Sequence, residues 1–331
     1  MTAHVPYPRF LGLVSSLEQA LFSSLTRTLW RRRIARDPRS PQWLPSIAKS
    51  AEELRRTISE LDVTAGGRDP ETVAYWGRWR DRLRRRILED DPAEFLTWEF
   101  MHSGMVCTRM DWGRVELAAL HRSQAWDRVW REALVEDPIG MPQLFPLHLR
   151  SSGALIHHAF HLLMFERWNG VGVEHLDSIL EFGGGYGSMR RLVARLGHRG
   201  RYHIHDLPEA VALQRFYLSA IEAVRPELHE ALETTFSAEI GGLPPPGFWR
   251  GRSLFLATWS FSETPVALRE HWLPILGSCS HFLIGYRASF DGIDNRRWFQ
   301  DFAARRPDVE WHHVEIAHRQ GEFYLIGAPK A

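Results

Sequence analysis

The chain has 331 residues, of which 44% are hydrophobic and 24% charged, as in an ordinary globular protein. At a formal net charge of +1 it lacks the basic excess that indicates nucleic acid or an acidic membrane as a partner, and we expect neither. The cysteines are too few for a disulfide framework or a metal site, and no secretory signal or membrane-spanning apolar run is visible, so we expect a cytoplasmic protein without metal.

Residues 1–150 have the pattern of helices, because apolar side chains recur at three- and four-residue spacing. Between 73 and 88 an aromatic and aliphatic stripe lies opposite several arginines, a pattern also found in RNA-binding faces. Neighbouring acids dilute this charge, so we interpret the stretch as an amphipathic helix with a solvated basic face. We expect residues 1–150 to form an all-helical cap domain that also mediates a homodimer.

From residue 176 onward short apolar segments alternate with helical patterns, which predicts a parallel sheet with crossover helices in a second domain, residues 151–331. The predicted parallel strands are Ser178–Phe182, Tyr202–His205, Leu232–Phe236, Ser253–Ser260 and Phe282–Tyr286. At the end of the chain, 309–317 and 323–328 flank a turn at 319–321 and predict an antiparallel hairpin. Open sheets of this kind bind ligands at the carboxyl ends of their strands, which the cap would cover.

A glycine-rich turn follows the first predicted strand, in the sequence Glu181-Phe182-Gly183-Gly184-Gly185-Tyr186-Gly187-Ser188. Glycines let a backbone approach a nucleoside closely, because no Cβ atoms stand in the way. The carboxylate of Asp206, about twenty residues on, closes the next strand and suits the hydroxyls of a ribose. Ser188 stands where a dinucleotide fingerprint has its third glycine. Together with the acid Glu181, this favours the sulfonium cofactor S-adenosylmethionine (SAM) over a dinucleotide.

Several segments together resemble a family of class I SAM-dependent enzymes described as sugar O-methyltransferases: Ala159–Leu162, Ile179–Gly187, Asp206–Glu209, Phe216–Leu218, Trp259–Glu263 and Phe290–Asn295. The resemblance implies an α/β fold, a Rossmann-like class I methyltransferase sheet with a terminal antiparallel hairpin, preceded here by the helical cap. It also implies that the glycines line the methionine and ribose, that Asp206 binds the ribose hydroxyls, and that Leu207 lies against adenine. The cofactor-binding residues expected on this basis are Glu181, Gly183, Gly185, Tyr186, Gly187, Asp206, Leu207, Ser237 and Ala238.

The methyl acceptor should bind beyond the fourth strand, near Trp259, Ser262, Glu263 and Glu270. Two carboxylates there would pair with a planar guanidinium and offset its repulsion from the cationic cofactor. The arrangement resembles the two-glutamate loop of arginine methyltransferases, although the two acids lie closer in sequence than in those enzymes. We therefore expect Glu263 and Glu270 to be catalytic in N-methylation of the guanidino group of arginine or an arginine-like metabolite, in small-molecule biosynthesis.

Other interpretations stay open. A sugar hydroxyl could be methylated on oxygen, which requires a base to take its proton. His157 and His161, one helical turn apart, are candidates for this role and for binding the substrate, or they pack under the cap. A nucleotide- or NAD-using enzyme on a similar sheet and an inactive methyltransferase-like scaffold are the alternatives of other classes.

Overall fold

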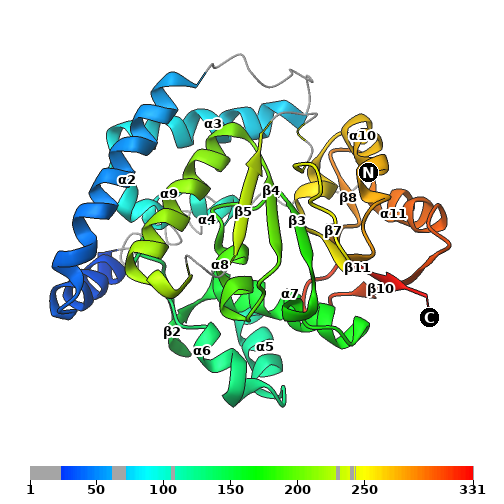
Figure 1. Ribbon diagram of the computed structural model, residues 1–331, viewed down its shortest axis with the longest axis horizontal. Coiled ribbons are helices and arrows are strands. Elements are labelled where there is room, and N and C mark those ends of the chain that lie inside the picture. Colours follow the sequence, from blue (N-terminus) through cyan, green and yellow to red (C-terminus); the bar gives the residue numbers. More distant parts are fainter. Residues whose placement is uncertain are drawn as a thin grey trace, which may run out of the picture.

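The computed structural model describes residues 24–61, 72–105, 109–228, 232–238, 242 and 244–330. At its centre lies a seven-stranded sheet in the order β10-β11-β7-β6-β3-β4-β5, with helices on both faces (Figure 1). Its strands are β3 Ser178–Phe182, β4 Arg201–His205, β5 Glu233–Ser237, β6 Ser253–Thr258, β7 His281–Arg287, β10 Val309–Glu315 and β11 Glu322–Pro329.

Strands β3 to β7 run parallel, whereas β11 is antiparallel to both β7 and β10. This confirms the predicted fold class, a Rossmann-like class I methyltransferase sheet with a terminal antiparallel hairpin. Strand β6 ends earlier than expected, because Trp259 has a φ of 67° and leaves the extended conformation.

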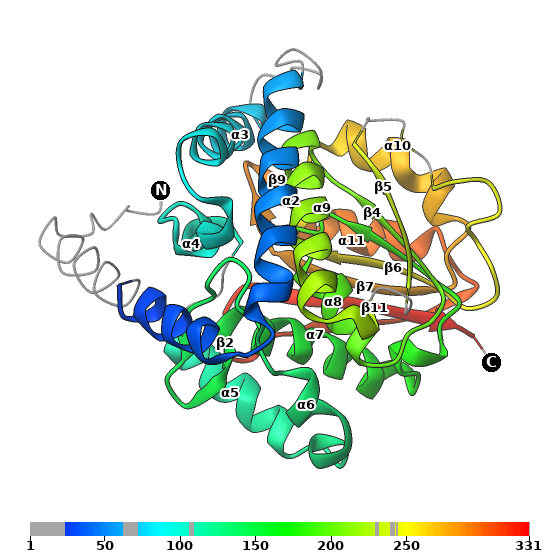
Figure 2. The same ribbon diagram turned by 60° about the vertical axis from the view of Figure 1, so that its left-hand side comes forward.

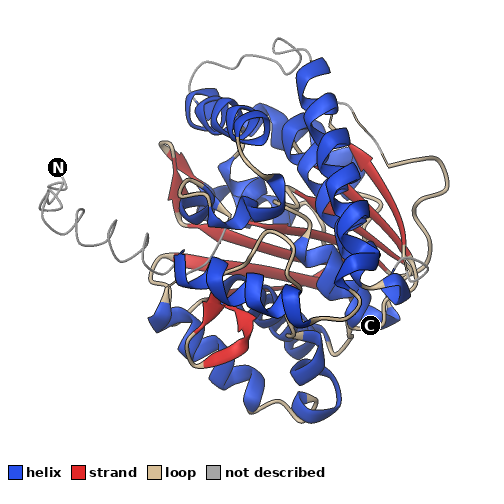
Figure 3. Ribbon diagram, turned by 90° about the vertical axis from the view of Figure 1, so that its left-hand side faces the viewer, coloured by secondary structure: helices blue, strands red, loops and turns tan. Residues whose placement is uncertain are grey.

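Two short hairpins were not expected from the sequence. One joins β1 Leu144–Phe145 to β2 His148–Ser152 and stands apart from the main sheet (Figure 3). The other joins β8 Ser289–Phe290 to β9 Ile293–Asp294. The first hairpin interrupts the otherwise helical N-terminal region and continues past residue 150 into α7.

Alternate residues of the sheet enter two separate apolar layers, as the two-residue period of a strand requires. Ile179 of β3 packs with the layer that contains α7, α8 and α9, and Leu180 packs with the layer that contains α10 and α11. These helices are α7 Gly153–Asn169, α8 Ser188–Arg195, α9 Pro208–Val224, α10 Val266–Leu276 and α11 Asn295–Ala304. Because both faces are covered, a ligand can reach the parallel strands only at their ends.

The N-terminal helices pack on the sheet region through a shared apolar core. Helix α2 (Ser40–Glu60) lies alongside α9, and α3 (Thr72–Glu89) contacts both of them (Figures 1 and 2). Buried side chains of α2 and α3 belong to the same cluster as those of α7, α8 and α9.

The remaining helical segments are residues 24–36, η1 Pro92–Thr97, α4 Met101–Gly104, α5 Met110–His121, η2 Trp126–Trp130, α6 Arg131–Ala133, η3 Val173–His175, η4 Pro226–Leu228 and η5 Ser260–Glu263. The helical pattern before residue 24 lies outside the described residues. Among the helices that are described, none is both long and apolar enough to cross a membrane.

The stretch predicted as an amphipathic helix with a basic face is α3, and its arginines divide between two environments. Those on the solvated face are exposed: Arg78, Arg82 and Arg85. Arg80 and Arg84 instead bind the carboxylate of Glu209 at the start of α9, with N···O distances of 2.7 and 3.1 Å. The side chain of Glu209 is 1% exposed, so this buried ion pair ties α3 to α9.

Candidate cofactor and acceptor site

The loop after β3 has the left-handed backbone that its glycines permit. Gly183, Gly185 and Gly187 have φ of 74°, 60° and 93°. A Cβ atom on Gly183 would lie 2.2 Å from Cβ of Ser260, so only glycine fits there without a shift. Among the described residues, the atom nearest to a Cβ on Gly185 would be Sδ of Met105, at 4.0 Å, so no described atom crowds this position. A ligand can therefore approach this backbone closely at the carboxyl edge of the sheet.

Asp206, directly after β4, holds this loop in place. Its Oδ2 accepts hydrogen bonds from the N–H of Gly185 (3.1 Å) and from Nε2 of Gln214 (2.7 Å), and its Oδ1 accepts one from the N–H of Leu207 (2.8 Å). Burial raises the pKa of the Asp206 carboxyl to about 7, although these hydrogen bonds oppose the rise. Gln214, on α9, also donates to the carbonyl of Gly185 (3.0 Å). Sequence reasoning missed Gln214, because no motif marks a glutamine in the second turn of the following helix.

Glu181, inside β3, lies beneath the same loop and is 5% exposed. Its Oε2 accepts a hydrogen bond from the hydroxyl of Tyr202 (2.8 Å), and a Cβ on Gly184 would lie 3.1 Å from this oxygen. Burial raises the pKa of the Glu181 carboxyl to about 8, and the nearby Asp206 adds to the rise. Two carboxyl groups that lie this close to an open loop suit a cationic ligand, because the ligand favours their ionised form.

Tyr186 belongs to the loop through its backbone only. Its ring is 3% exposed and packs edge-to-face against Phe95 of η1 and Tyr217 of α9, with centroids 5.6 and 5.1 Å away. The ring therefore anchors the N-terminal region to the cofactor loop.

Leu207, Ser237 and Ala238 lie at the carboxyl ends of β4 and β5, where all three are half-buried. The hydroxyl of Ser237 lies 2.8 Å from Nε2 of His203 and 2.9 Å from Nδ1 of His205. The hydroxyl of Ser237 is therefore hydrogen-bonded within the protein. Contacts of Leu207, Ser237 and Ala238 with adenine stay predictions.

The part of the site where the sequence predicts the acceptor, called the acceptor side below, is built around Trp259, which follows β6. The guanidinium of Arg319, in the turn between β10 and β11, lies 4.4 Å from the ring of Trp259 and 4.0 Å from that of Trp112 on α5. Arg319 also donates hydrogen bonds to Nε2 of His157 (2.8 Å) and to Glu322. This sandwich brings α5, from the N-terminal region, to the carboxyl edge of the sheet.

The turn η5 connects the cofactor loop to the acceptor side. The hydroxyl of Ser260 donates to the carbonyl of Phe182, and that of Ser262 donates to the carbonyl of Trp259 (2.7 Å). Ser262 is fully buried, and its own carbonyl accepts a hydrogen bond from Nη2 of Arg269 (2.6 Å). In this arrangement the side chain of Ser262 stabilises the turn, and that of Glu263 reaches the acceptor side.

Glu263 and Glu270, expected to act together, have different partners. The Glu263 side chain is 13% exposed and faces Arg287 at the end of β7, with an N···O distance of 3.9 Å. Burial raises the pKa of its carboxyl to about 7, with Arg287 opposing and Glu322 adding to the rise. Glu270 forms an ion pair of 2.9 Å with Arg305 at the surface of α10 and α11. The pairing of Glu263 with Glu270 stays a prediction, and Glu322, which no motif marks, is the acid near Glu263.

His157 and His161 lie one turn apart on α7, as predicted, and both are buried. Nδ1 of His157 lies 2.7 Å from Oε1 of Glu116, and its Nε2 lies 2.8 Å from Nη1 of Arg319, so both ring nitrogens have a partner. His161 is fully buried with its Nδ1 against the hydroxyl of Tyr324, and burial lowers its pKa well below the usual value. The other ring nitrogen of His161, Nε2, is buried and has no hydrogen-bond partner among the described residues.

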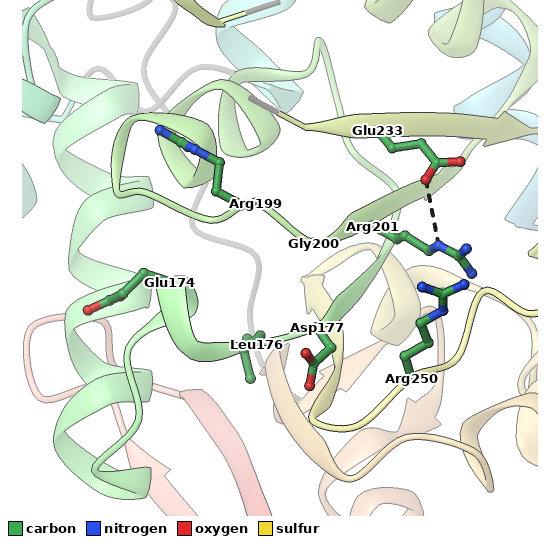
Figure 4. Close-up of a pocket in the computed structure, with 8 residues that line it drawn as sticks. All are labelled: Glu174, Leu176, Asp177, Arg199, Gly200, Arg201, Glu233 and Arg250. Carbon is green, nitrogen blue, oxygen red and sulfur yellow. Dashed lines mark ion pairs between the residues drawn. The ribbon is translucent and has the colours of Figure 1, made fainter. Parts of the chain in front are cut away.

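A separate cavity of about 450 Å³ lies at the opposite edge of the sheet, among the starts of β3, β4 and β5 (Figure 4). It is lined by Glu174, Leu176, Asp177, Arg199, Gly200, Arg201, Glu233 and Arg250. Charges of both signs face it, and Arg201 pairs with Glu233 at 3.6 Å. Because open α/β sheets bind ligands at the carboxyl ends of their strands, we do not include this cavity in the candidate site.

No profile of a known protein family matches the chain, and no curated protein matches it. Similar solved structures include the small RNA methyltransferase HEN1, 10% identical with a TM-score of 0.41 over 53% of this chain and 25% of that one. The methyltransferase domain of bacterial CtHen1 is 8% identical, with a TM-score of 0.40 over 53% of this chain and 97% of that one. The glycopeptide N-methyltransferase MtfA, solved with SAM, is 10% identical, with a TM-score of 0.36 over 46% of this chain and 82% of that one. At such low similarity, the fold class rests on the strand order and connections of this chain itself.

Proposed function

We propose that the chain is a SAM-dependent methyltransferase that acts on a small polar molecule. The observation that carries this proposal is the open, left-handed glycine loop above the carboxyl groups of Glu181 and Asp206, at the carboxyl edge of a parallel sheet. The loop backbone and Asp206 would hold the nucleoside, and Glu181 would lie near its positive charge. The cofactor would supply a methyl group activated by its bond to a cationic sulfur.

For the acceptor we propose a guanidino nitrogen of arginine or of an arginine-like metabolite. Glu263 supports this choice, because its mostly buried carboxylate already faces a guanidinium, that of Arg287. The carboxylate would orient the attacking nitrogen and receive the proton that it gives up. The pKa of the Glu263 carboxyl, about 7, suits this proton transfer near neutral pH.

Methylation of a sugar hydroxyl has less support. Such a hydroxyl needs a base, and both ring nitrogens of His157 are engaged while His161 is fully buried. Turnover of labelled SAM with a panel of arginine analogues and sugars separates the two acceptors. Methylation of the sugars alone would contradict the guanidino proposal.

Calorimetric titration with S-adenosylhomocysteine (SAH) tests the cofactor assignment. We expect the wild type to bind, and Asp206→Ala to bind about tenfold or more weakly, because the hydrogen bonds between the Asp206 carboxyl group and the ribose are lost. Asp308→Ala removes an exposed carboxylate that pairs with Arg306, and this control should bind SAH like the wild type. Binding of NAD in place of SAH would contradict the assignment, and binding of neither would favour an inactive scaffold.

A further inference from the structure

Arg287, the last residue of β7, lies between two carboxylates on the acceptor side. Its Nη1 is 3.9 Å from Oε1 of Glu263, and its Nε is 3.7 Å from Oε1 of Glu322. The antiparallel register of β11 and β7 sets Glu322 directly opposite Arg287. Glu263 arrives from the η5 turn, so two elements distant in sequence supply the two acids.

These three side chains differ in their exposure. The side chains of Glu263 and Glu322 are each 13% exposed, whereas that of Arg287 is 49% exposed. The two N···O distances are longer than hydrogen bonds, and among the described residues none donates a hydrogen bond to the Glu263 carboxylate. A mostly buried carboxylate is stabilised by charge-assisted hydrogen bonds. Glu263 and Glu322 can therefore bind a planar cation that lies closer to them than Arg287 does.

Arg319, unlike Arg287, is a buried and hydrogen-bonded partner of Glu322. Its side chain is 7% exposed, lies between the rings of Trp112 and Trp259, and hydrogen-bonds to Oε2 of Glu322. Arg319 therefore fixes Glu322 in place, while Oε1 of that carboxylate still faces Arg287.

We propose that Glu263 and Glu322 bind the guanidinium group of the acceptor, and that Arg287 occupies this place until the acceptor displaces it. The inference rests on the proposed function and names Glu322, in place of Glu270, as the second carboxylate. Exchange of one guanidinium for another leaves the charge of the site unchanged. A half-exposed ion pair is also weak, so Arg287 can turn toward solvent at little cost.

Calorimetric titration of the SAH-saturated protein with agmatine and with L-arginine tests the exchange. Arg287→Ala should bind both compounds about threefold more tightly, because the internal competitor is gone. Glu322→Gln should bind both about tenfold more weakly, because a charge-assisted hydrogen bond is lost. Arg305→Ala, which breaks another ion pair of a half-exposed arginine, is the matched control and should bind like the wild type.

Weaker binding of both compounds by Arg287→Ala would overturn the proposal. Weaker binding of L-arginine alone by Arg287→Ala would assign Arg287 to the ligand's carboxylate and would also overturn the proposal.

Unchanged binding by Glu322→Gln, or an equal loss of affinity in Glu270→Gln, would reject Glu322 as the second acid. If Glu322→Gln fails to fold, Glu322→Asp replaces it and should also bind both compounds more weakly, because its shorter side chain withdraws the carboxylate from the ligand. SAH affinity is measured first in every variant, and if SAH does not bind, the same titrations without it test the carboxylate pair independently.

Discussion

Glu181 and Asp206 hold protons at neutral pH that ordinary carboxyl groups have lost. Their pKa values are about 8 and about 7, against ordinary values of 4.5 and 3.8, because both groups are buried. The unfolded chain binds fewer protons over this interval, so their contribution to the free energy of unfolding decreases as the pH rises from about 4 to about 8. A cationic ligand favours the ionised carboxylates, so its affinity should increase as the pH rises through the upper part of the interval.

We predict that SAM binds more tightly at about pH 9 than at about pH 6. In Glu181→Gln the affinity should be lower and should stop rising above about pH 7, because only Asp206 still titrates. SAH, which lacks the positive sulfur, is the matched ligand and should show a much smaller pH dependence. Calorimetric titrations across this range measure the effect, and a flat SAM profile in the wild type would contradict it.

Among the elements, the η5 turn is in direct contact with the glycine loop. Ser260 touches the place where Gly183 has no side chain, and its hydroxyl holds the carbonyl of Phe182. The left-handed Trp259 starts this turn and ends β6. A residue that leaves the strand here directs Glu263 toward β7 and β11.

Gly183→Ala should therefore damage both stability and cofactor binding. The new methyl group would lie 2.2 Å from Cβ of Ser260, at a φ of 74° that alanine adopts poorly. Gly170→Ala, at a φ of 65° with no atom within 4 Å, isolates the backbone cost of about 1 kcal/mol. We expect Gly183→Ala to lower the free energy of unfolding by about 2 kcal/mol more than that control, with weaker SAH binding. Chemical denaturation measures both variants. An equal loss of unfolding free energy in Gly183→Ala and Gly170→Ala would show that the loop accommodates the methyl group.

Strand positions were well predicted, because the apolar pattern of a buried strand is local. Ser178–Phe182 has the same bounds in the sequence prediction and in the structure. The partners of the charged side chains could not be read from the sequence. Glu270 lies at the surface with Arg305, whereas Glu263 faces Arg287. Sequence spacing places two acids near one another along the chain and does not specify the direction of their side chains.

Across the whole molecule, the N-terminal region reaches the site and also exposes apolar side chains. Trp112 and Phe95 contact Arg319 and Tyr186 at the carboxyl edge of the sheet. On its outer side the exposed apolar residues include Leu25, Leu29 and Leu44, with exposures of 60%, 45% and 43%. Such side chains support the expected homodimer through the N-terminal helices, which we retain as a proposal.

Light scattering during size exclusion measures this assembly. We expect a mass of twice 38.3 kDa for the wild type, and a shift toward one chain for the double variant Leu25→Glu, Leu29→Glu, because the charges would face an apolar partner surface. Val266→Glu, at a 39% exposed position on α10, is the control and should leave the mass unchanged. A wild-type mass of one chain would rule out the dimer at the concentration measured.

The sequence by itself determined the parallel strands, the terminal hairpin, the left-handed glycine loop and the acid at the end of β4. These features depend on apolar periodicity and on the conformational freedom of glycine, both of which are properties of short segments. Only the tertiary structure decided that Gln214 supports Asp206, that Arg319 lies between two tryptophans, and that Glu322 lies opposite Arg287. Such contacts join residues far apart in the chain, and strand order and side-chain packing, which no local spacing encodes, bring them together.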